Sequence, residues 1–258
     1  MKTLSNPKIS IITIAFNAYS DGLEKTIESV VKQKNDSIEY IIIDGGSNDL
    51  SHDVYKKYHE SVDYFISEKD KGISDAFNKG VRASKGDYIW FLNAGDYLND
   101  YAVEHVENFI EKHQQSIIYG DMFWVENRKI SLLCPSESYE DKIRYVMPFL
   151  HPSTIVKKTI FQDVGYFDTS LKRAMDYDLL VRAYLSQHRA IKIDFPLAFM
   201  TAGGVHDSDY LKTLKEVMHV STRNGAKRYI ALLALIYTYL NKKSDFFVFI
   251  KKKLRGIR

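Results

Sequence analysis

Cysteine is almost absent from this chain of 258 residues, since Cys134 is the only one. A single cysteine excludes a disulfide framework and leaves no cysteine spacing for a structural zinc site. It also suits a reducing compartment, so we expect a cytoplasmic protein.

Long apolar runs are missing as well. No stretch reaches the ~20 apolar residues that a membrane-spanning helix needs, and the first run (8–16) is interrupted by Ser10 and Thr13, so neither a span nor a signal peptide is expected. Internal repeats and low-complexity tracts are also absent. With 45% hydrophobic and 13% aromatic residues, the chain can bury a core as one large α/β unit or two fused lobes.

The glycine motifs that cradle phosphates are lacking too. No G-x-G-x-x-G follows the first apolar run, and no G-x-x-x-x-G-K-[ST] occurs anywhere. Both absences count against a Rossmann dinucleotide site and a P-loop.

A net excess of positive charge is confined to the tail. Residues 226–258 contain nine Lys or Arg and one Asp, so the net charge of +3 divides into +8 for the tail and −5 for the rest. A nucleic-acid-binding body would spread its excess of cations over the fold. We therefore expect no nucleic-acid partner.

In the first hundred residues, segments with the apolar spacing of strands alternate with segments that have the apolar spacing of helices. Short β-branched and aromatic runs alternate with segments of helical spacing such as 22–34 and 72–85, which predicts a βαβα pattern and a mostly parallel sheet flanked by helices. The expected strands are 8–14, 38–44, 62–68 and 87–93. Ligands of such sheets bind beyond the carboxyl ends of the strands. The loops expected to converge there are 15–17, 44–49, 67–72 and 93–96.

These loops carry acids. Asp44 is suited to accept hydrogen bonds from a base or ribose, and Asp96 is suited to a divalent cation, which prefers oxygen ligands. An Asp at a strand end, taken alone, is more often a turn or cap residue than a ligand contact. Four polar loops at one sheet edge favour a ligand site.

Two long segments carry a family resemblance: "ISIITIAFN…EYIIIDGGSND…SEKDKGISDAFNKGVRASKGDYIWFLNAGDYL" and "HPSTIVKK…FQDVGYFDTSLKRAMDYDLLVRA…GGVH". Together they resemble the family 2 glycosyltransferases of bacterial polysaccharide biosynthesis, in family order over roughly residues 8–206. The resemblance implies a GT-A fold and an inverting hexosyltransferase. Such an enzyme moves a sugar from a nucleotide-diphosphate donor, UDP-sugar being our expectation, to a glycan or lipid-linked glycan acceptor, with Mn²⁺ or Mg²⁺. The nucleotide-sugar lobe is expected in 1–100, the acceptor lobe of the same domain in 101–207 and a helical, basic tail in 208–258.

The same resemblance implies a donor site, with two departures. The nucleotide-binding positions are Ala15, Asn17, Asp44, Asp70, Lys71, Asp75, Asn78, Asn93 and Ala94. Gly45 replaces the second acid of the family's "DDGS" motif, and Gly95 replaces the middle acid of its metal motif. Asp96 and His206 remain as metal ligands, so we expect weak cation binding. Asp75 and Asn78 have a simpler interpretation, since residues spaced i and i+3 on a helix often only brace it.

The acceptor side is expected around 149–154 and 174–178. Attack at an anomeric carbon is assisted by a carboxylate that takes the acceptor proton, and Asp176 ends the stretch that resembles the family's "ED" signature. His151, Ser153 and Asp178 are the candidate acceptor residues. Asp176 and Asp178 are two apart on an expected helix, so only one should face the site. A turn histidine and an N-terminal acidic cap are the simpler interpretations.

The tail combines an apolar segment (228–240) with a cationic end (251–258). Helices of this kind bind the interface of an anionic membrane, or else pack on the domain or in a homo-oligomer. Two rival functions remain from other classes. One is a non-catalytic nucleotide-sugar-binding or scaffold protein; the other is a nucleotidyltransferase, which should show a Gly-rich basic first loop that "TIAFNAYSDG" lacks.

Overall fold

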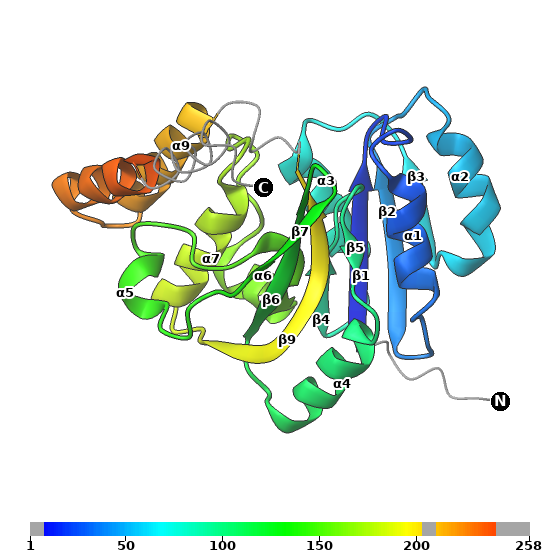
Figure 1. Cartoon of the computed structure of the whole chain (residues 1–258), viewed down its shortest axis with the longest axis horizontal. Coiled ribbons are helices and arrows are strands. Elements are labelled where there is room, and N and C mark those ends of the chain that lie inside the picture. Colours follow the sequence, from blue (N-terminus) through cyan, green and yellow to red (C-terminus); the bar gives the residue numbers. More distant parts are fainter. Residues whose placement is uncertain (1–7, 203–209, 241–258) are drawn as a thin grey trace, which may run out of the picture.

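The structure is a computed structural model that describes residues 8–202 and 210–240. Helices flank a central sheet that runs through most of the domain (Figure 1). Nine strands form this sheet, in the order β3-β2-β1-β4-β8-β6-β9-β5, with β7 paired to β6 at the side. The strands are β1 (Ile9–Ala15), β2 (Ile38–Asp44), β3 (Tyr64–Ser67), β4 (Tyr88–Phe91), β5 (Tyr97–Leu98), β6 (Ile117–Glu126), β7 (Lys129–Leu133), β8 (Thr154–Lys157) and β9 (Ala190–Thr201).

The first four predicted strands are confirmed, and they pair in parallel as β3-β2-β1-β4. Beyond β4 the sheet becomes mixed, because β8 runs antiparallel to both β4 and β6 while β6 and β9 are parallel. The parallel arrangement predicted from the βαβα pattern thus describes the first half. Both halves belong to one sheet, and residues of both expected lobes contribute to the core on each face of it.

Helices cover both faces of the sheet. Adjacent residues of β1 divide between two cores: Ile11 packs with α1, α2 and α4, whereas Ile12 packs with α3, α6 and α7. Burial on both faces explains why β1 and β2 read as continuous apolar runs. The helices are α1 (Leu23–Val31), α2 (Ser51–Tyr58), α3 (Ile73–Ala83), α4 (Ala102–Lys112), α5 (Glu140–Ile143), α6 (Thr159–Val164), α7 (Met175–Leu185) and α9 (Tyr210–Arg223), with short 3₁₀ turns η1 (His59–Ser61) and η2 (His151–Ser153).

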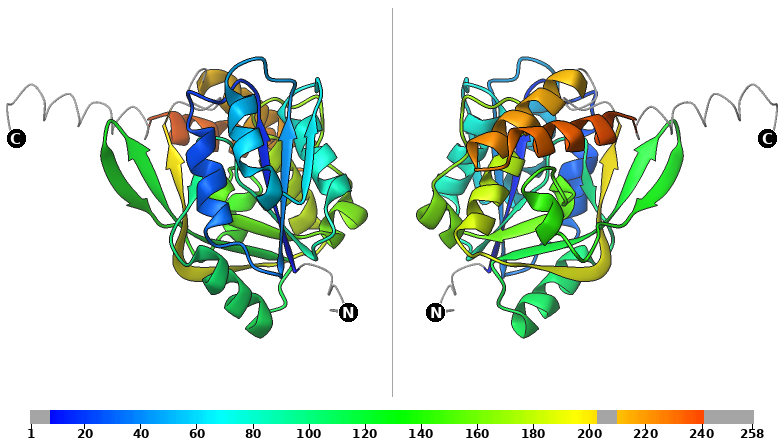
Figure 2. Two further views of the ribbon diagram at one scale, coloured as in Figure 1. Left: turned by 90° about the vertical axis from the view of Figure 1, so that its right-hand side faces the viewer. Right: turned by 90° about the vertical axis from the view of Figure 1, so that its left-hand side faces the viewer.

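The predicted helical tail begins with α9, and residues 228–240 form a further helix on the outer side of the molecule (Figure 2). α9 is tied to α7 by an ion pair between Arg223 and Asp178. Among the described helices, none combines the length and apolar character needed to cross a membrane.

Candidate active site

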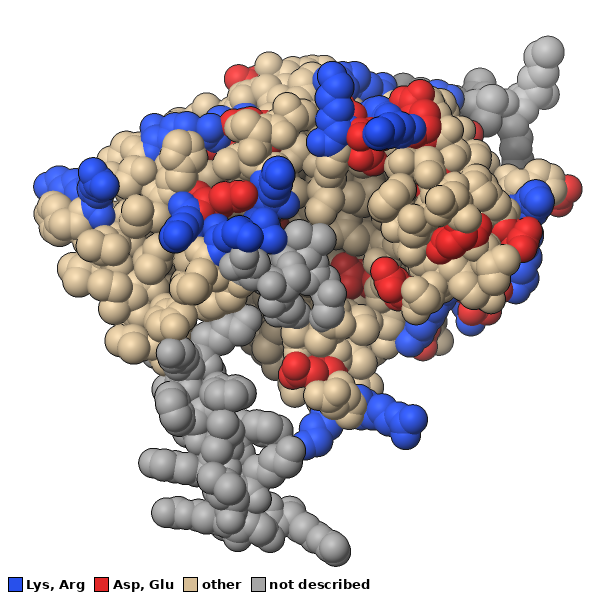
Figure 3. Space-filling model, turned by 90° about the horizontal axis from the view of Figure 1, so that it is seen from above, with Lys and Arg blue, Asp and Glu red and all other residues tan. Residues whose placement is uncertain are grey.

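A cavity of about 410 Å³ lies at the carboxyl ends of β1 and β4. From above, the surface is hollowed near its middle, with acidic and basic side chains on the rim (Figure 3). The lining comes from both halves of the sheet and from the start of α7. It consists of Ser20, Asp21, Ile73, Phe77, Asn93, Ala94, Gly95, Asp96, His151, Lys172, Met175, Asp176, Met200, Thr201 and Ala202. The cavity therefore unites five predicted site residues: Asn93, Ala94, Asp96, His151 and Asp176.

The Asn93–Asp96 turn follows β4 and is fixed by its backbone. The Ala94 amide donates to the carbonyl of Ile14, and the Asp96 amide donates to the carbonyl of Asn93. Gly95 has φ +99°, and a Cβ at this position would lie 2.9 Å from the carbonyl oxygen of Asp21. The positive φ and the close approach both require glycine at this position. The backbone of the turn therefore excludes the middle acid of the family's metal motif.

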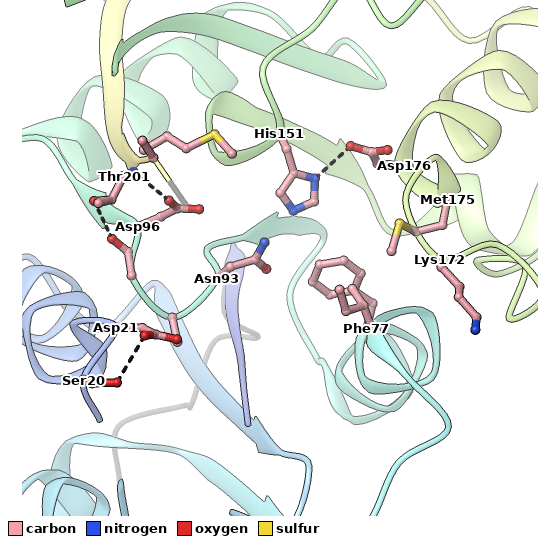
Figure 4. A pocket seen from close by; sticks show the side chains of 15 residues that line it. Ser20, Asp21, Phe77, Asn93, Asp96, His151, Lys172, Met175, Asp176 and Thr201 are labelled. Atoms are coloured by element: carbon pink, nitrogen blue, oxygen red, sulfur yellow. Dashed lines mark hydrogen bonds and ion pairs between the residues drawn. The ribbon is translucent and has the colours of Figure 1, made fainter. Parts of the chain in front are cut away.

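Asp96 is a buried carboxylate at one end of the cavity (Figure 4). Its Oδ1 accepts a hydrogen bond of 3.3 Å from the Thr201 amide. Burial raises the pKa of Asp96 to about 7, although the nearby His151 and the Thr201 amide act in the opposite direction. No Lys or Arg among the described residues forms an ion pair with it. A cation bound beside it would favour the charged form.

His151 and Asp176 form a pair at the other end. The Nδ1 atom of His151 lies 3.4 Å from Oδ2 of Asp176, and both side chains keep slight exposure (14% and 13%). The imidazole packs against Phe77 and Phe91, which fixes its plane. Asp176 Oδ1 accepts a hydrogen bond from the Tyr177 amide. The carboxylate is thus held at the first turn of α7 with its edge at the cavity.

Two polar atoms in the middle of the cavity have no hydrogen-bond partner in the described structure. They are His151 Nε2 and Asn93 Oδ1, and both are buried. His151 and Asn93 lie between Asp96 and Asp176 in Figure 4. Buried polar atoms without partners are costly, so these two atoms favour a polar ligand between the two acids.

Asp178 lies outside the cavity, which corrects its prediction as an acceptor residue. It is 1% exposed, and it pairs with Arg182 at 2.9 Å and with Arg223 at 2.5 Å. The expectation that only one acid of the pair faces the site is confirmed. Asp178 instead fastens α7 to α9, with Arg223 also reaching Asp168.

The loop before α7 is held by a carboxylate from α9. Glu216 accepts hydrogen bonds from the backbone amides of Lys172, Arg173 and Ala174. These amides precede the first turn of α7, where a negative charge is stabilising. Glu216 therefore positions the loop that leads into Asp176.

Asp44 is a buried carboxylate that several protein groups hold by hydrogen bonds. It is fully buried, and it accepts hydrogen bonds from Ser47, Ser67 and Tyr55 as well as from the Gly46 amide. Burial acts to raise its pKa, yet these hydrogen bonds hold the pKa below its ordinary value. Asp44 thus shapes the 45–48 loop at the end of β2, and its direct contact with the nucleotide stays a prediction.

Asn17 and Ala15 support the same loop. The Asn17 side chain accepts from the Asn48 amide and its own amide donates to Ser47, while the Ala15 carbonyl accepts from Gly45. An exposed edge lies beside them. A Cβ on Gly45 would lie 2.6 Å from Oδ2 of Asp70 and 3.3 Å from the ring of Phe16, so Asp70 occupies the space of the missing second acid.

Three further predictions are corrected by structural roles. Asn78 is buried and exchanges two hydrogen bonds with the backbone of Phe167, and Ser153 is buried and donates to the carbonyl of Asp121. Asp75 accepts from the Lys71 amide within its own turn, as the bracing interpretation expected. The Lys71 side chain is exposed outside the cavity lining.

Sequence reasoning missed Phe16, Asp21 and Lys172. Phe16 is 63% exposed although it directly follows a buried strand, and that position was the available signal. Asp21 and Lys172 line the cavity from the loops before α1 and α7. Nothing in their local pattern distinguishes them from solvated surface residues.

The described residues contain no cluster of three or more His, Cys, Asp or Glu side chains arranged to hold a metal. The Asp96 carboxylate and the unpartnered Asn93 Oδ1 are both oxygen ligands that suit Mg²⁺ or Mn²⁺. They fit a cation whose remaining ligands come from a bound diphosphate. His206, the other predicted ligand, lies outside the described residues.

Comparison with known proteins identifies the family to which this chain belongs. Residues 10–161 match the model of glycosyl transferase family 2, and the chain belongs to that family. An uncharacterised glycosyltransferase of Mycobacterium tuberculosis is 30% identical over 196 residues, covering 70% of each chain. A Rickettsia prowazekii relative, also an uncharacterised glycosyltransferase, is 28% identical, and the match covers 69% of this chain and 59% of the relative.

A third relative matches this chain over nearly its whole length. It is the PGL/p-HBAD biosynthesis glycosyltransferase of Mycobacterium bovis, and the match, at 22% identity, covers 89% of this chain and 91% of the relative. Among solved structures, residues 1–349 of Staphylococcus aureus TarS in complex with UDP-GlcNAc give a TM-score of 0.68 at 20% identity, covering 88% of this chain and 70% of that one. The fold is therefore GT-A, and the chain is a glycosyltransferase.

Proposed function

We propose that the chain transfers a sugar from a UDP-sugar to an acceptor hydroxyl with inversion, and that Asp176 is the general base. The observation that carries the proposal is one cavity with an acid at each end: the buried Asp96 near the end of β4 and the partly buried Asp176 at the start of α7. The TarS structures with UDP-GlcNAc and with UDP support the choice of nucleotide.

The donor is expected to lie across the ends of β1, β2 and β4. The exposed ring of Phe16 offers a stacking surface for the base, and Asp70 beside it offers an acceptor for base or ribose hydrogens. The diphosphate then reaches the Asn93–Asp96 turn, and Lys172 on the cavity wall supplies a positive charge. The sugar falls between Asn93 and His151, and the unpartnered Nε2 atom of His151 can bond its hydroxyls.

A divalent cation, Mn²⁺ or Mg²⁺, is part of the proposal, held by Asp96 and Asn93 together with the diphosphate. When bound, it would neutralise negative charge that develops on the departing UDP. His206 stays a candidate ligand.

The acceptor hydroxyl is expected at Asp176. The carboxylate takes the hydroxyl proton while the oxygen forms its bond to the anomeric carbon, and the bond from that carbon to the UDP oxygen breaks with its electron pair going to UDP. His151 acts on Asp176 by holding its Oδ2 and keeping its plane fixed. The acceptor class proposed is a glycan or lipid-linked glycan of surface polysaccharide assembly, at the cytoplasmic face of a membrane. The name of the Mycobacterium bovis relative supports a biosynthetic glycosyltransferase of that kind.

The test is single-turnover transfer from a panel of UDP-sugars, with and without Mn²⁺, after thermal shift has identified the donors that bind. The alternative is a non-catalytic nucleotide-sugar-binding protein, which the lone buried acid of the Asn93–Asp96 turn favours. A donor that binds but is neither transferred nor hydrolysed would support the alternative.

A further inference from the structure

The helix of residues 228–240 exposes one continuous apolar face. No charged residue occurs between Tyr229 and Leu240. Six large apolar side chains are 43–68% exposed, namely Tyr229, Leu232, Leu233, Ile236, Tyr237 and Leu240. Their spacing of three and four residues places them on one side of the helix, while Ala231 on the other side is buried.

This face differs from the other exposed apolar residues. Phe16, Leu50 and Tyr101 are exposed singly on separate loops, which is ordinary for a protein surface, and the exposed apolar group of β7 is smaller, with Ile130, Leu132 and Leu133. A contiguous apolar stripe is uncommon and marks an interaction site. The helix lies on the outer side of the molecule, where such a face is accessible to a large partner (Figure 2).

Lysine and arginine residues flank the apolar face of the 228–240 helix in the sequence. Lys227 and Arg228 precede it and are exposed. Lys242 and Lys243 follow it, and the chain continues to a cationic end; these later residues lie outside the described part. We propose that the 228–240 helix binds the surface of an anionic phospholipid bilayer, with its apolar face in the acyl boundary and the flanking cations at the headgroups.

Three observations favour a bilayer over a second copy of the chain. Two copies paired through this face would bring together tails of +8 each, which repel one another. Tyr229 and Tyr237 place an apolar ring with a polar tip on the face, as suits a membrane–water interface. The described part of the helix, 228–240, is also shorter than the ~20 residues of a membrane span, and a helix with one apolar face suits the interface plane instead.

The experiment is cosedimentation of the full chain with vesicles of phosphatidylglycerol and phosphatidylcholine in equal parts, and with phosphatidylcholine alone. We expect the chain to sediment with the anionic vesicles at low salt, and less so as salt rises. The double variant Leu233→Ser/Tyr237→Ser should weaken this binding by about tenfold or more, because two apolar side chains no longer leave water. The matched control is Ile130→Ser/Leu132→Ser on β7, which removes equally exposed apolar residues elsewhere and should leave binding unchanged.

Several results would overturn the proposal. If the parent chain stays in the supernatant with anionic vesicles at low salt, the 228–240 helix is a packing element and the proposal is wrong. An equal loss of binding in the β7 control would show a non-specific effect of removing apolar side chains. Dissociation of an oligomer by Leu233→Ser/Tyr237→Ser in sedimentation velocity without vesicles would identify a second copy as the partner. If that variant melts at a lower temperature, Lys227→Gln/Arg228→Gln replaces it, and unchanged vesicle binding by this variant at low salt would count against the headgroup contact.

Discussion

The Nδ1 atom of His151 lies 3.4 Å from Oδ2 of Asp176, while Nε2 of the same ring is buried without a partner in the described structure. The ring also lowers the pKa of Asp96 by its charge, against the larger opposing effect of burial. One histidine therefore stands between the acid expected at the leaving group and the acid expected at the acceptor. This relationship connects the two halves of the sheet in the proposed reaction.

Asp176→Asn should lower single-turnover transfer by ~10²–10⁴-fold, the usual contribution of a general base. The amide keeps the shape of the side chain but cannot take the proton. Donor affinity should stay unchanged, because the base meets the acceptor. The matched control is Asp178→Asn, which breaks a buried contact with Arg182 and Arg223 and should lower the melting temperature. Normal transfer by Asp176→Asn together with a loss of transfer in folded Asp178→Asn would contradict the assignment.

His151→Gln should reduce transfer by about 10–100-fold, because a carboxylate displaced by a fraction of an ångström loses alignment with the acceptor. UDP affinity measured by calorimetry should change little if the ring acts on Asp176 rather than on the nucleotide. The double variant with Asp176→Asn should then show less than the sum of the two effects. Additive effects would separate His151 from the base.

Asp96→Asn should stabilise the free protein at high pH. Its pKa is raised from 3.8 to about 7, so between these values the folded state holds a proton that the unfolded chain has released, and stability falls as pH rises. The gain in unfolding free energy at pH about 8 should be at most about 4 kcal/mol, and it should vanish near pH 4. Thermal melts across this range measure it. A variant less stable than the parent at high pH would contradict the burial argument, and the same variant should bind donor and Mn²⁺ more weakly.

Gly95→Asp should fail to restore a conventional metal motif. The residue has φ +99°, and a Cβ would lie 2.9 Å from the carbonyl oxygen of Asp21. We expect a loss of about 1–3 kcal/mol in stability from the strained backbone, without tighter Mn²⁺ binding. Denaturant unfolding and Mn²⁺ titration in the presence of UDP test this. An unchanged stability with tighter Mn²⁺ binding would show that the turn accepts an acid.

Phe16→Ala should weaken UDP binding, since loss of a base-stacking ring costs about 1–3 kcal/mol. Asp70→Asn should weaken it as well, if this carboxylate bonds the base or ribose. Ile130→Ala, at a similarly exposed position on β7, is the control for loss of an exposed apolar side chain. Calorimetry with UDP measures all three, and an affinity unchanged by Phe16→Ala would remove the base from this edge.

The alternation of strands and helices in the first hundred residues could be predicted from local pattern alone, because buried strands and amphipathic helices have different apolar periods. The same holds for the position of the loop acids after strand ends and for the divergence of Asp176 and Asp178, since both follow from spacing along one element.

Which of these acids line the cavity depends on the tertiary structure. Asp44 is hidden because Tyr55 of α2 and Ser67 of β3 add their hydrogen bonds to those of the adjoining loop. Asp70 occupies the space that Gly45 leaves, and His151 of η2 reaches Asp176 of α7. Such contacts join residues far apart in the chain, and no local pattern encodes them. The antiparallel second half of the sheet has the same origin, since strand direction there depends on which strand each segment finds as its neighbour.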